Sequence, residues 1–445
     1  MSQPTAAPTT EPRVDEKNVR RAAFAGLIGT MLEQYDFVIY GTASALIFNK
    51  LFFPDVSPAV GVMAAMSAYA VGFLARPLGG LFFARFGDRL GRKWVMISTL
   101  FLMGIATFAI GLIPSYYTIG VLAPVLLVIC RILQGFGAGA EQAGGVTLLA
   151  ETAPTRRRGF YASLVLVGAA LGSVLGALAW VWAQSLPTDD LQSWGWRAVF
   201  FTSAIVTIAA YILRRKLNES PVFAETQEAR IGQQDTPIGD VLRNGRPSLW
   251  RVFLVNMGSN GQSYIYQVFM GSYLVTWLGV QTRFIPQLLL YGALGACLAA
   301  FGAGWLTDRI GRRPVIVGVL IFLFCFPIPA FLLLGTKNTL AIGFVVVIGF
   351  MVAGYATVGC QGAWYAEMFG SRYRYAGISL AREFSSVFGG GMAPLVSSAL
   401  ITWAAGSWWP VAAYMMVMIG LSLFGAIKSP ETRGRDLRLT EDAVR

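Results

Sequence analysis

Seven charged side chains lie inside long apolar stretches of this sequence, where they could perform chemistry away from water. They are Glu33, Asp36, Arg76, Arg131, Glu141, Arg382 and Glu383. A charge at the middle of a lipid bilayer costs about 3 kcal/mol on insertion scales, so these groups should face the protein interior and pair with one another. Buried carboxylates can exchange protons, and the forked guanidinium group suits the binding of carboxylates. Proton exchange and anion binding are therefore the chemistry that these residues predict.

The sequence contains no histidine, and its four cysteines lie far apart: Cys130, Cys297, Cys325 and Cys360. The most common general base and metal ligand at neutral pH is therefore missing. Isolated cysteines without a CxxC pair indicate neither a metal site nor a disulfide framework. We expect no metal, no cofactor and no catalytic residue, and hence no enzyme.

The first apolar stretch carries Glu33, Asp36 and Tyr40 at i, i+3 and i+7, which is one face of a helix. We expect this face, with the neighbouring Tyr35, to line a central cavity in which Asp36 or Glu33 takes up a proton. The alternative is a static buried ion pair that fixes the packing of the helices.

Two further stretches supply basic candidates for the cavity. Arg76 is the single charge of the second stretch, and Arg131 shares a stripe with Gln134 and Glu141 on the fourth. Arg131 could bind a substrate carboxylate through its bidentate fork. Permanent pairing within its own half of the chain is the competing interpretation.

The second part of the chain carries a polar stripe and one charged pair. The stripe either lines the substrate cavity or holds helices together, and it consists of Asn256, Asn260, Tyr264 and Gln267. Arg382 and Glu383 lie about two turns into the eleventh stretch. They either contribute to substrate specificity or reach towards the membrane surface.

The composition explains where these residues must sit. Of 445 residues, 55% are hydrophobic and 13% are charged, and the mean hydropathy is +0.59. Soluble domains contain about 25% charged residues, because charge covers their surface. A soluble protein is therefore excluded, and the apolar residues must face lipid.

Twelve stretches approach the ~20 apolar residues that a spanning helix needs. They cover approximately residues 22–48, 60–84, 94–113, 117–149, 159–183, 198–213, 252–278, 285–306, 315–335, 338–363, 376–403 and 408–427. We expect an all-α membrane protein with an N-terminal tail (1–21), a six-helix bundle (22–213), a linker (214–251), a second six-helix bundle (252–427) and a C-terminal tail (428–445).

The positive charges orient these spans. Of the 35 Lys and Arg residues, 28 fall in the tails and loops of one side and four in the loops of the other. The positive-inside rule places the first side, with both termini, in the cytoplasm, and the protein in the cell inner membrane. The same distribution accounts for the net charge of +12 without a nucleic-acid partner.

The chain contains an internal repeat. The pattern D-R-x-G-R-[KR] occurs at Asp88–Lys93 and again at Asp308–Arg313, offset by 220 residues. The pattern A-E-x4-R-x-R occurs at Ala150–Arg158 and at Ala366–Arg374, offset by 216 residues. A duplicated six-helix unit around a midplane site is the architecture of secondary transporters.

These repeated motifs resemble those of the major facilitator superfamily, and further motifs are similar to its metabolite:H+ symporter family. The motifs shared with the symporter family are Glu33–Phe37, Tyr40–Ala43, Leu51–Pro54, Arg76–Gly80, Ser193–Arg197, Glu219–Phe223 and Gly389–Gly391. The resemblance covers about residues 22 to 434, and the stretch from Glu367 to Tyr375 is most similar to shikimate-type members. Other members carry 2-oxoglutarate, citrate, proline or betaine.

The resemblance implies that the repeated motifs form a cytoplasmic gate that holds the outward-facing state. The gate residues are Asp88, Arg89, Gly91, Arg92, Glu151, Arg158, Asp308, Arg309, Gly311, Arg312, Glu367 and Arg374. We expect Arg92 to pair with Glu151, and Arg312 with Glu367. Asp88 is expected to face a helix N-terminus, whose dipole favours an anion.

The expected function is import of a small polar metabolite together with a proton by alternating access. An organic acid such as shikimate or a dicarboxylate is favoured, and a zwitterion such as proline or betaine is the alternative. A drug exporter is disfavoured because 159–183 lacks a Gly-Pro motif, and a sugar facilitator because the seventh span lacks a Gln-Gln pair. The expected partners are the substrate, the proton and the lipid bilayer, with the monomer as the functional unit.

Overall fold

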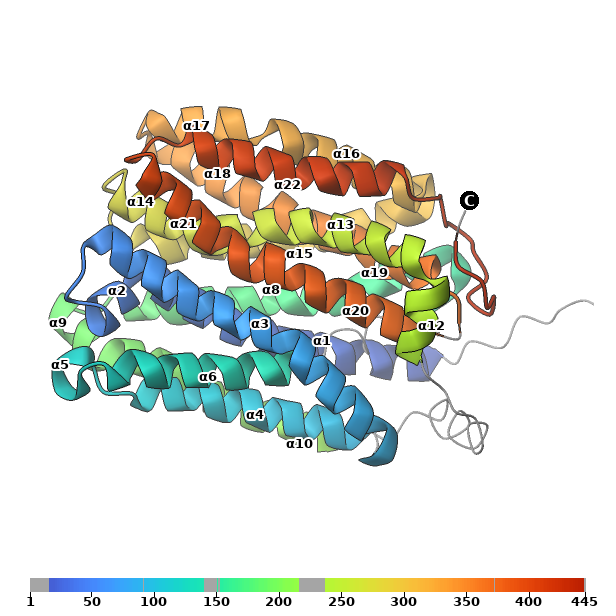
Figure 1. Cartoon of the computed structure of the whole chain (residues 1–445), viewed down its shortest axis with the longest axis horizontal. Coiled ribbons are helices and arrows are strands. Elements are labelled where there is room, and N and C mark those ends of the chain that lie inside the picture. The colour runs from blue at the N-terminus through green and yellow to red at the C-terminus, as the bar shows by residue number, and fades with distance from the viewer. Residues whose placement is uncertain are drawn as a thin grey trace, which may run out of the picture.

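The computed structural model describes residues 16–90, 92–139, 150, 153–215, 237–371 and 373–443. Within these ranges all regular structure is helical. Figure 1 shows the long helices running side by side, with those of the first half below and those of the second half above. Each half is thus a bundle of helices, and the two bundles meet along their length.

The first half contains six long helices. They are α1 (Glu16–Leu46), α3 (Pro58–Leu90), α4 (Arg92–Leu112), α6 (Leu122–Ala138), α8 (Arg158–Ala183) and α10 (Trp196–Arg215). Three short helices connect them at one end of the bundle: α2 (Phe48–Phe52), α5 (Tyr116–Ile119) and α9 (Thr188–Asp190). The connection before α8 is the 3-10 turn η1 (Thr155–Arg157), and α9 continues through the π turn η2 (Leu191–Gly195) into α10.

The second half also runs along the bundle six times, and four of these six spans consist of two or three consecutive elements. The two uninterrupted spans are α15 (Phe284–Ile310) and α22 (Trp409–Ile427). The four interrupted spans are α13 (Arg246–Tyr264) with η3 (Ile265–Phe269) and α14 (Met270–Thr276); α16 (Arg312–Cys325) with α17 (Pro327–Gly335); α18 (Thr339–Met351) with η4 (Val352–Ala356) and α19 (Thr357–Met368); and α20 (Arg374–Ser386) with η5 (Val387–Met392) and α21 (Ala393–Trp403). The segments η3, η4 and η5 are π turns. The short helix α12 (Pro237–Asn244) precedes α13.

The described residues therefore form the twelve spans that the sequence predicts. Eight helices are long and apolar enough by themselves to cross a membrane, and Ile97–Leu112 and Leu122–Ala138 are shorter apolar helices. The two remaining spans, α1 and α13 with η3 and α14, are diluted by polar residues such as Glu33 and Asn256, which are buried. The polar side chains of these two spans thus face the protein rather than lipid.

The expected continuous span over 117–149 is wrong at its start. The chain forms α5 first, turns at Gly120 and begins α6 at Leu122. Gly120 has φ +59°, a left-handed conformation that glycine adopts at little cost and that ends the short helix. Residues 140–149 lie outside the described part of the chain.

Glycines set the close contact between α1 and α8. A side chain at Gly168 or Gly172 would collide with the carbonyl oxygens of Leu27 and Met31 on α1. Small residues at this spacing let two helix backbones approach and are common at helix contacts in membranes. The contact holds Glu33 and Asp36 in a fixed position on α1.

We predict that Gly172→Ala lowers the thermal stability of the purified protein by about 1–3 kcal/mol, because the new methyl group meets backbone atoms that cannot move aside. The matched control is Gly302→Ala on α15, where no atom lies within 4 Å of the added carbon. Alanine at that exposed helical site should leave stability unchanged or raise it slightly. Equal melting temperatures for the two variants in detergent would contradict the assigned helix contact.

Candidate functional site

A buried ion cluster joins the two halves. Arg76 on α3 lies between Glu33 on α1 and Glu383 on α20. The exposed fractions of these three residues are 3%, 2% and 4%. The Nε of Arg76 donates a hydrogen bond to Glu383 at 2.8 Å, and its Nη2 forms an ion pair with Glu33 at 2.8 Å. Glu33 and Arg76 belong to the first half, and Glu383 belongs to the second. One guanidinium group therefore ties the halves together.

Two aromatic rings pack on one side of Arg76. The guanidinium carbon lies 5.2 Å from the ring centre of Phe37 and 5.5 Å from that of Phe73. Such contacts attract a cation to the ring and shield it from water. Tyr264 on α13 packs against Phe73, with ring centres 5.2 Å apart. The Nε and Nη2 of Arg76 are the groups for which the structure gives carboxylate partners.

The second buried guanidinium group, Arg131 on α6, lies within the first half. It stands 3.9 Å from the ring centre of Tyr40 and 4.9 Å from that of Tyr69. Its Nη1 donates to Gln134 at 2.8 Å and its Nη2 to the carbonyl oxygen of Tyr69 at 3.4 Å. Asp36 is close enough to Arg131 to attract it electrostatically. Of the two interpretations, these contacts favour pairing inside the half.

The residues of the α1 face point to different partners. Glu33 pairs with Arg76, and Tyr40 covers Arg131. Glu33 and Asp36 also line a small cavity between α1, α4 and α10, with Leu32, Leu100, Met103, Val206 and Thr207. The hydroxyl of Tyr35 bonds to that of Thr202 on α10. The spacing i, i+3, i+7 thus distributes side chains over one ionic cluster instead of aligning them along one channel.

The polar stripe of the seventh span divides into two parts. Asn256 and Asn260 donate to Ser385 and Ser386 of α20, at 2.6 and 3.0 Å, and so hold helices of the second half together. Gln267 instead accepts a hydrogen bond of 3.1 Å from Gln34 on α1, across the two halves. Of the four stripe residues, Tyr264 and Gln267 face the other half.

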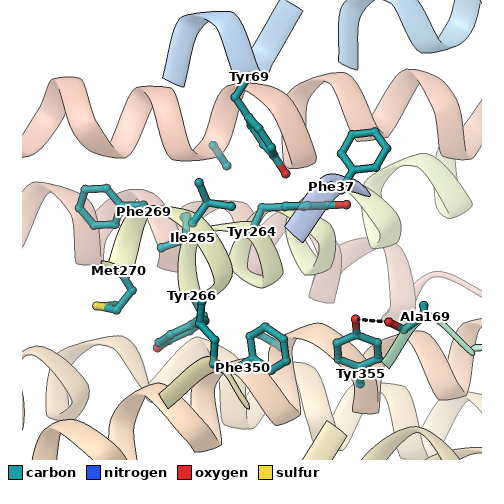
Figure 2. Close-up of a cluster of buried hydrophobic side chains, with 14 of the residues drawn as sticks. Phe37, Tyr69, Ala169, Tyr264, Ile265, Tyr266, Phe269, Met270, Phe350 and Tyr355 are labelled. Atoms are coloured by element: carbon teal, nitrogen blue, oxygen red, sulfur yellow. Dashed lines mark hydrogen bonds between the residues drawn. The ribbon is translucent and has the colours of Figure 1, made fainter. Parts of the chain in front are cut away.

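A small central cavity lies between the halves, next to this contact. It is lined by Phe37, Val38, Tyr69, Ser173, Gln267, Val268, Leu289 and Phe350. Figure 2 shows Phe37, Tyr69 and Tyr264 grouped on one side of α13 and η3, with Tyr266, Phe350 and Tyr355 on the other. The hydroxyl of Tyr355 bonds to Ser173 at 2.7 Å and to the carbonyl oxygen of Ala169 at 3.2 Å, again across the halves. The Tyr69 hydroxyl is buried without a hydrogen-bond partner in the described structure.

A second ionic network closes one end of the bundle, which we call the tail end: the end where α12 and residues 428–443 lie, on the right of Figure 1. Glu367 on α19 accepts hydrogen bonds from Arg158 of the first half at 2.9 Å and from Arg312 at 3.1 and 3.2 Å. The expected pair of Arg312 and Glu367 is therefore present, and Arg158 adds a tie between the halves.

Asp308 makes another tie at the tail end. Its two carboxylate oxygens accept from the backbone N–H groups of Gly159 and Phe160 at 2.9 and 2.8 Å, and Arg312 pairs with it at 2.6 Å. Gly159 and Phe160 begin α8, so the carboxylate caps a helix N-terminus, where the dipole favours an anion. The capped helix belongs to the opposite half, which the sequence does not reveal.

The other gate candidates at this end have structural contacts. Arg309 lies over the ring of Trp305 at 3.9 Å, and Gly311 has φ +111°, where the chain turns from α15 into α16. Arg374 donates to the carbonyl oxygens of Ala366 and Leu437. Arg382 is half-buried and lies close enough to Tyr365 to influence it electrostatically.

Six candidates fall outside what the structure describes. Gly91, Glu141 and Glu151 lie outside the described residues, and the same holds for the side chains of Asp88, Arg89 and Arg92. The pair expected between Arg92 and Glu151 stays a prediction.

The C-terminal segment 428–443 takes part in the tail-end network, which the sequence analysis missed. Glu431 accepts from the backbone N–H groups of Arg312 and Arg313 at 2.9 and 3.0 Å and so caps α16. Thr432 donates to Glu367 at 2.8 Å. Further along, Asp442 accepts from the backbone of Gly370 and from the Tyr373 hydroxyl, at 2.9 and 2.8 Å. The one available signal was the echo of Ser220-Pro221 by Ser429-Pro430, immediately before Glu431.

Comparison with known proteins gives close sequence relatives. The chain is 38% identical to the shikimate transporter of Escherichia coli K12 over 414 residues, which cover 92% of this chain and 94% of that protein. It is 34% identical to the proline/betaine transporter of the same strain, over 96% of this chain and 86% of the relative.

Solved structures support the same fold. A D-xylose-proton symporter superimposes with a TM-score of 0.68 at 18% identity, covering 94% of this chain and 100% of that one. The xylose transporter of E. coli in a partially occluded inward-open conformation gives 0.67 at 18%, over 95% and 100%. The sequence model of the Major Facilitator Superfamily matches residues 26–394. The chain is therefore a multi-pass membrane transporter of metabolites rather than an enzyme, and it belongs to the major facilitator superfamily.

Proposed function

We propose that this transporter is a proton-coupled symporter that imports a small organic acid by alternating access. The observation that carries the proposal is the buried Arg76, which is held by carboxylates of both halves beside a closed central cavity. A guanidinium group in such a place can bind a carboxylate that enters the cavity. The similarity to a shikimate transporter supports an acid as the substrate.

Charge balance supports proton coupling. The buried cluster contains three carboxylates, Glu33, Asp36 and Glu383, and two guanidinium groups, Arg76 and Arg131. Counting these five groups alone, the carboxylates exceed the cations by one. An unbalanced charge inside a membrane protein is costly, and one added proton removes it. We assign that proton to Asp36 or Glu33, because both lie in one cluster with the two arginines.

The bonds that join the two halves at the tail end and near the cavity support alternating access. At the tail end, Asp308 and Glu367 bind α8 of the first half, and near the cavity Gln34 bonds to Gln267. We infer from the excess of Lys and Arg that the tail end faces the cytoplasm, with both termini there and the protein in the inner membrane. Since one chain supplies both walls of the cavity, the monomer is sufficient for transport.

A zwitterion is the second candidate substrate, because the chain is also similar to proline/betaine transporters. The same cluster offers Arg76 to a carboxylate and Glu33 or Glu383 to a cationic group. The identity of the compound that moves protons therefore decides between the two classes.

We predict that adding the correct organic acid to de-energised cells that express the protein makes a weakly buffered medium more alkaline. Proton entry with the substrate causes this change, and Asp36→Asn should abolish it if Asp36 carries the proton. Glu33→Gln tests the other carboxylate in the same assay. The matched control is Asp442→Asn, whose carboxylate contacts only the tail-end surface of the second half. Saturable uptake without any change of pH would refute proton coupling.

We predict that Asp308→Asn raises the fraction of transporters that are open at the tail end about ten-fold. Hydrogen bonds to a charged group contribute about 1.5–3 kcal/mol each, and this contribution is lost with the charge. The reporter is a cysteine in place of Ser163, which is buried on α8 against Gly304 of the other half. The exposed Cys325 is replaced by Ala. A membrane-impermeant maleimide should label inside-out vesicles faster in the Asp308→Asn background, whereas Asp442→Asn should label at the parent rate. Equal rates for all three would exclude the assigned gate.

A further inference from the structure

Two N–H positions of Arg76 are already held by carboxylates. The rings of Phe37 and Phe73, whose centres are 5.1 Å apart, pack on one side of its guanidinium group, and its Nη2 and Nε face Glu33 and Glu383. A substrate carboxylate that binds Nε or Nη2 must therefore take a position that one glutamate holds. The two glutamates are not equivalent, because Glu33 lies on the same half as Arg76 and Glu383 on the other.

The described contacts divide the guanidinium edge between two carboxylates. Nε donates to one oxygen of Glu383, and Nη2 faces one oxygen of Glu33. A carboxylate that is free to orient itself usually takes two parallel N–H groups of an arginine, and this bidentate pairing is stronger than a single contact. An entering acid can thus exchange favourably with Glu383, whose position is fixed by α20.

The cavity and Arg76 share aromatic neighbours. Phe37 lines the cavity and also packs on Arg76. Tyr264 packs on Phe73, the other ring beside Arg76, and on Tyr69, which lines the cavity, with ring centres 5.2 and 6.1 Å apart. A solute that enlarges the cavity therefore moves the rings that pack on Arg76.

The contact that follows the ion pair along the chain is apolar. After α20, the chain enters η5, where Gly390 and Gly391 pack directly against the ring of Phe73 on α3. Apolar surfaces separate without the orientation that an ion pair imposes. Loss of the Glu383 bond would remove a charge-assisted bond between α20 and α3 and leave this packing in place.

We propose that Glu383 is an internal substitute for the substrate carboxylate: it occupies Arg76 while the cavity is empty, and a bound acid displaces it and so releases the two halves. This inference rests on the proposed import of an organic acid, and it identifies Glu383 as the residue that makes a carboxylate a requirement for transport. A neutral ester of the same acid has no carboxylate to offer and leaves the pair of Arg76 and Glu383 intact. Binding without a carboxylate therefore does not open the transporter.

The test uses Glu383→Gln, which keeps the size of the side chain and leaves Arg76 paired with Glu33. In the Ser163→Cys reporter background, we expect labelling of the tail end without substrate to rise at least about ten-fold, because a charge-assisted bond between the halves is lost. We also expect the Kd for the transported acid, measured by tryptophan fluorescence of the purified protein, to fall about ten-fold as the internal competitor disappears. In the parent, the acid should speed labelling and its methyl ester should not.

Asp442→Asn is the control, since its carboxylate lies outside the Arg76 cluster and bonds to Gly370 and Tyr373 of the second half. It should leave labelling without substrate at the parent rate. If the parent transports an acid but Glu383→Gln neither tightens its binding nor speeds labelling, the exchange at Arg76 is refuted while the proposed function stands. If the parent instead binds and moves only a zwitterion or a neutral compound, the proposed function fails and the exchange fails with it. Equal labelling by acid and ester in the parent would also overturn the proposal.

Discussion

The cost of a charge inside a bilayer is the constraint on which this structure depends. Arg76 can remain buried only because carboxylates meet it from two directions, and one of those carboxylates belongs to the other half. The position of α20 relative to α3 is thereby fixed by electrostatics, and the glycines of η5 then let the two helices touch. A transporter gains from such an arrangement, because the interaction that closes the halves is also one that a charged solute can replace.

The duplicated sequence does not lead to a symmetric set of contacts. In the second copy, Asp308 and Glu367 bind residues at the start of α8, so a motif of one half holds the other half in place. Residues 428–443 strengthen the same end, since Glu431 caps α16 and Thr432 bonds to Glu367. The second copy of the motif thus acts between the halves as well as within its own, and the chain after α22 extends that role.

The twelve spans and their buried charges could be predicted from the sequence, because hydropathy and the cost of a charge are local properties. The pair of Arg312 and Glu367 could be predicted from the repeat. The partner of Arg76 could not, since Glu383 lies 307 residues away and meets it only after both halves have packed. The polar stripe of the seventh span misled for a related reason. Its four residues share one ideal helical face, but the π turn at Ile265–Phe269 changes the direction of Gln267. Asn256 and Asn260 therefore bond to α20, while Gln267 reaches Gln34.

The two ends of the cavity are closed by different kinds of contact, apolar packing at one end and buried ion pairs at the other. At the end away from the tail, α1 meets η3 and α14 through small and apolar residues, with Gly41 against Val268 and Ala45 near Gly271. These contacts are individually weak and can separate gradually. At the level of Arg76 and at the tail end, the halves are joined by buried ion pairs, whose separation would leave charges without partners. Opening towards the tail end therefore requires compensating charge, whereas opening away from it does not. In the proposed symport, a carboxylate and a proton would supply that compensation together, and the coupling of the two solutes would follow from where the chain buries its charges.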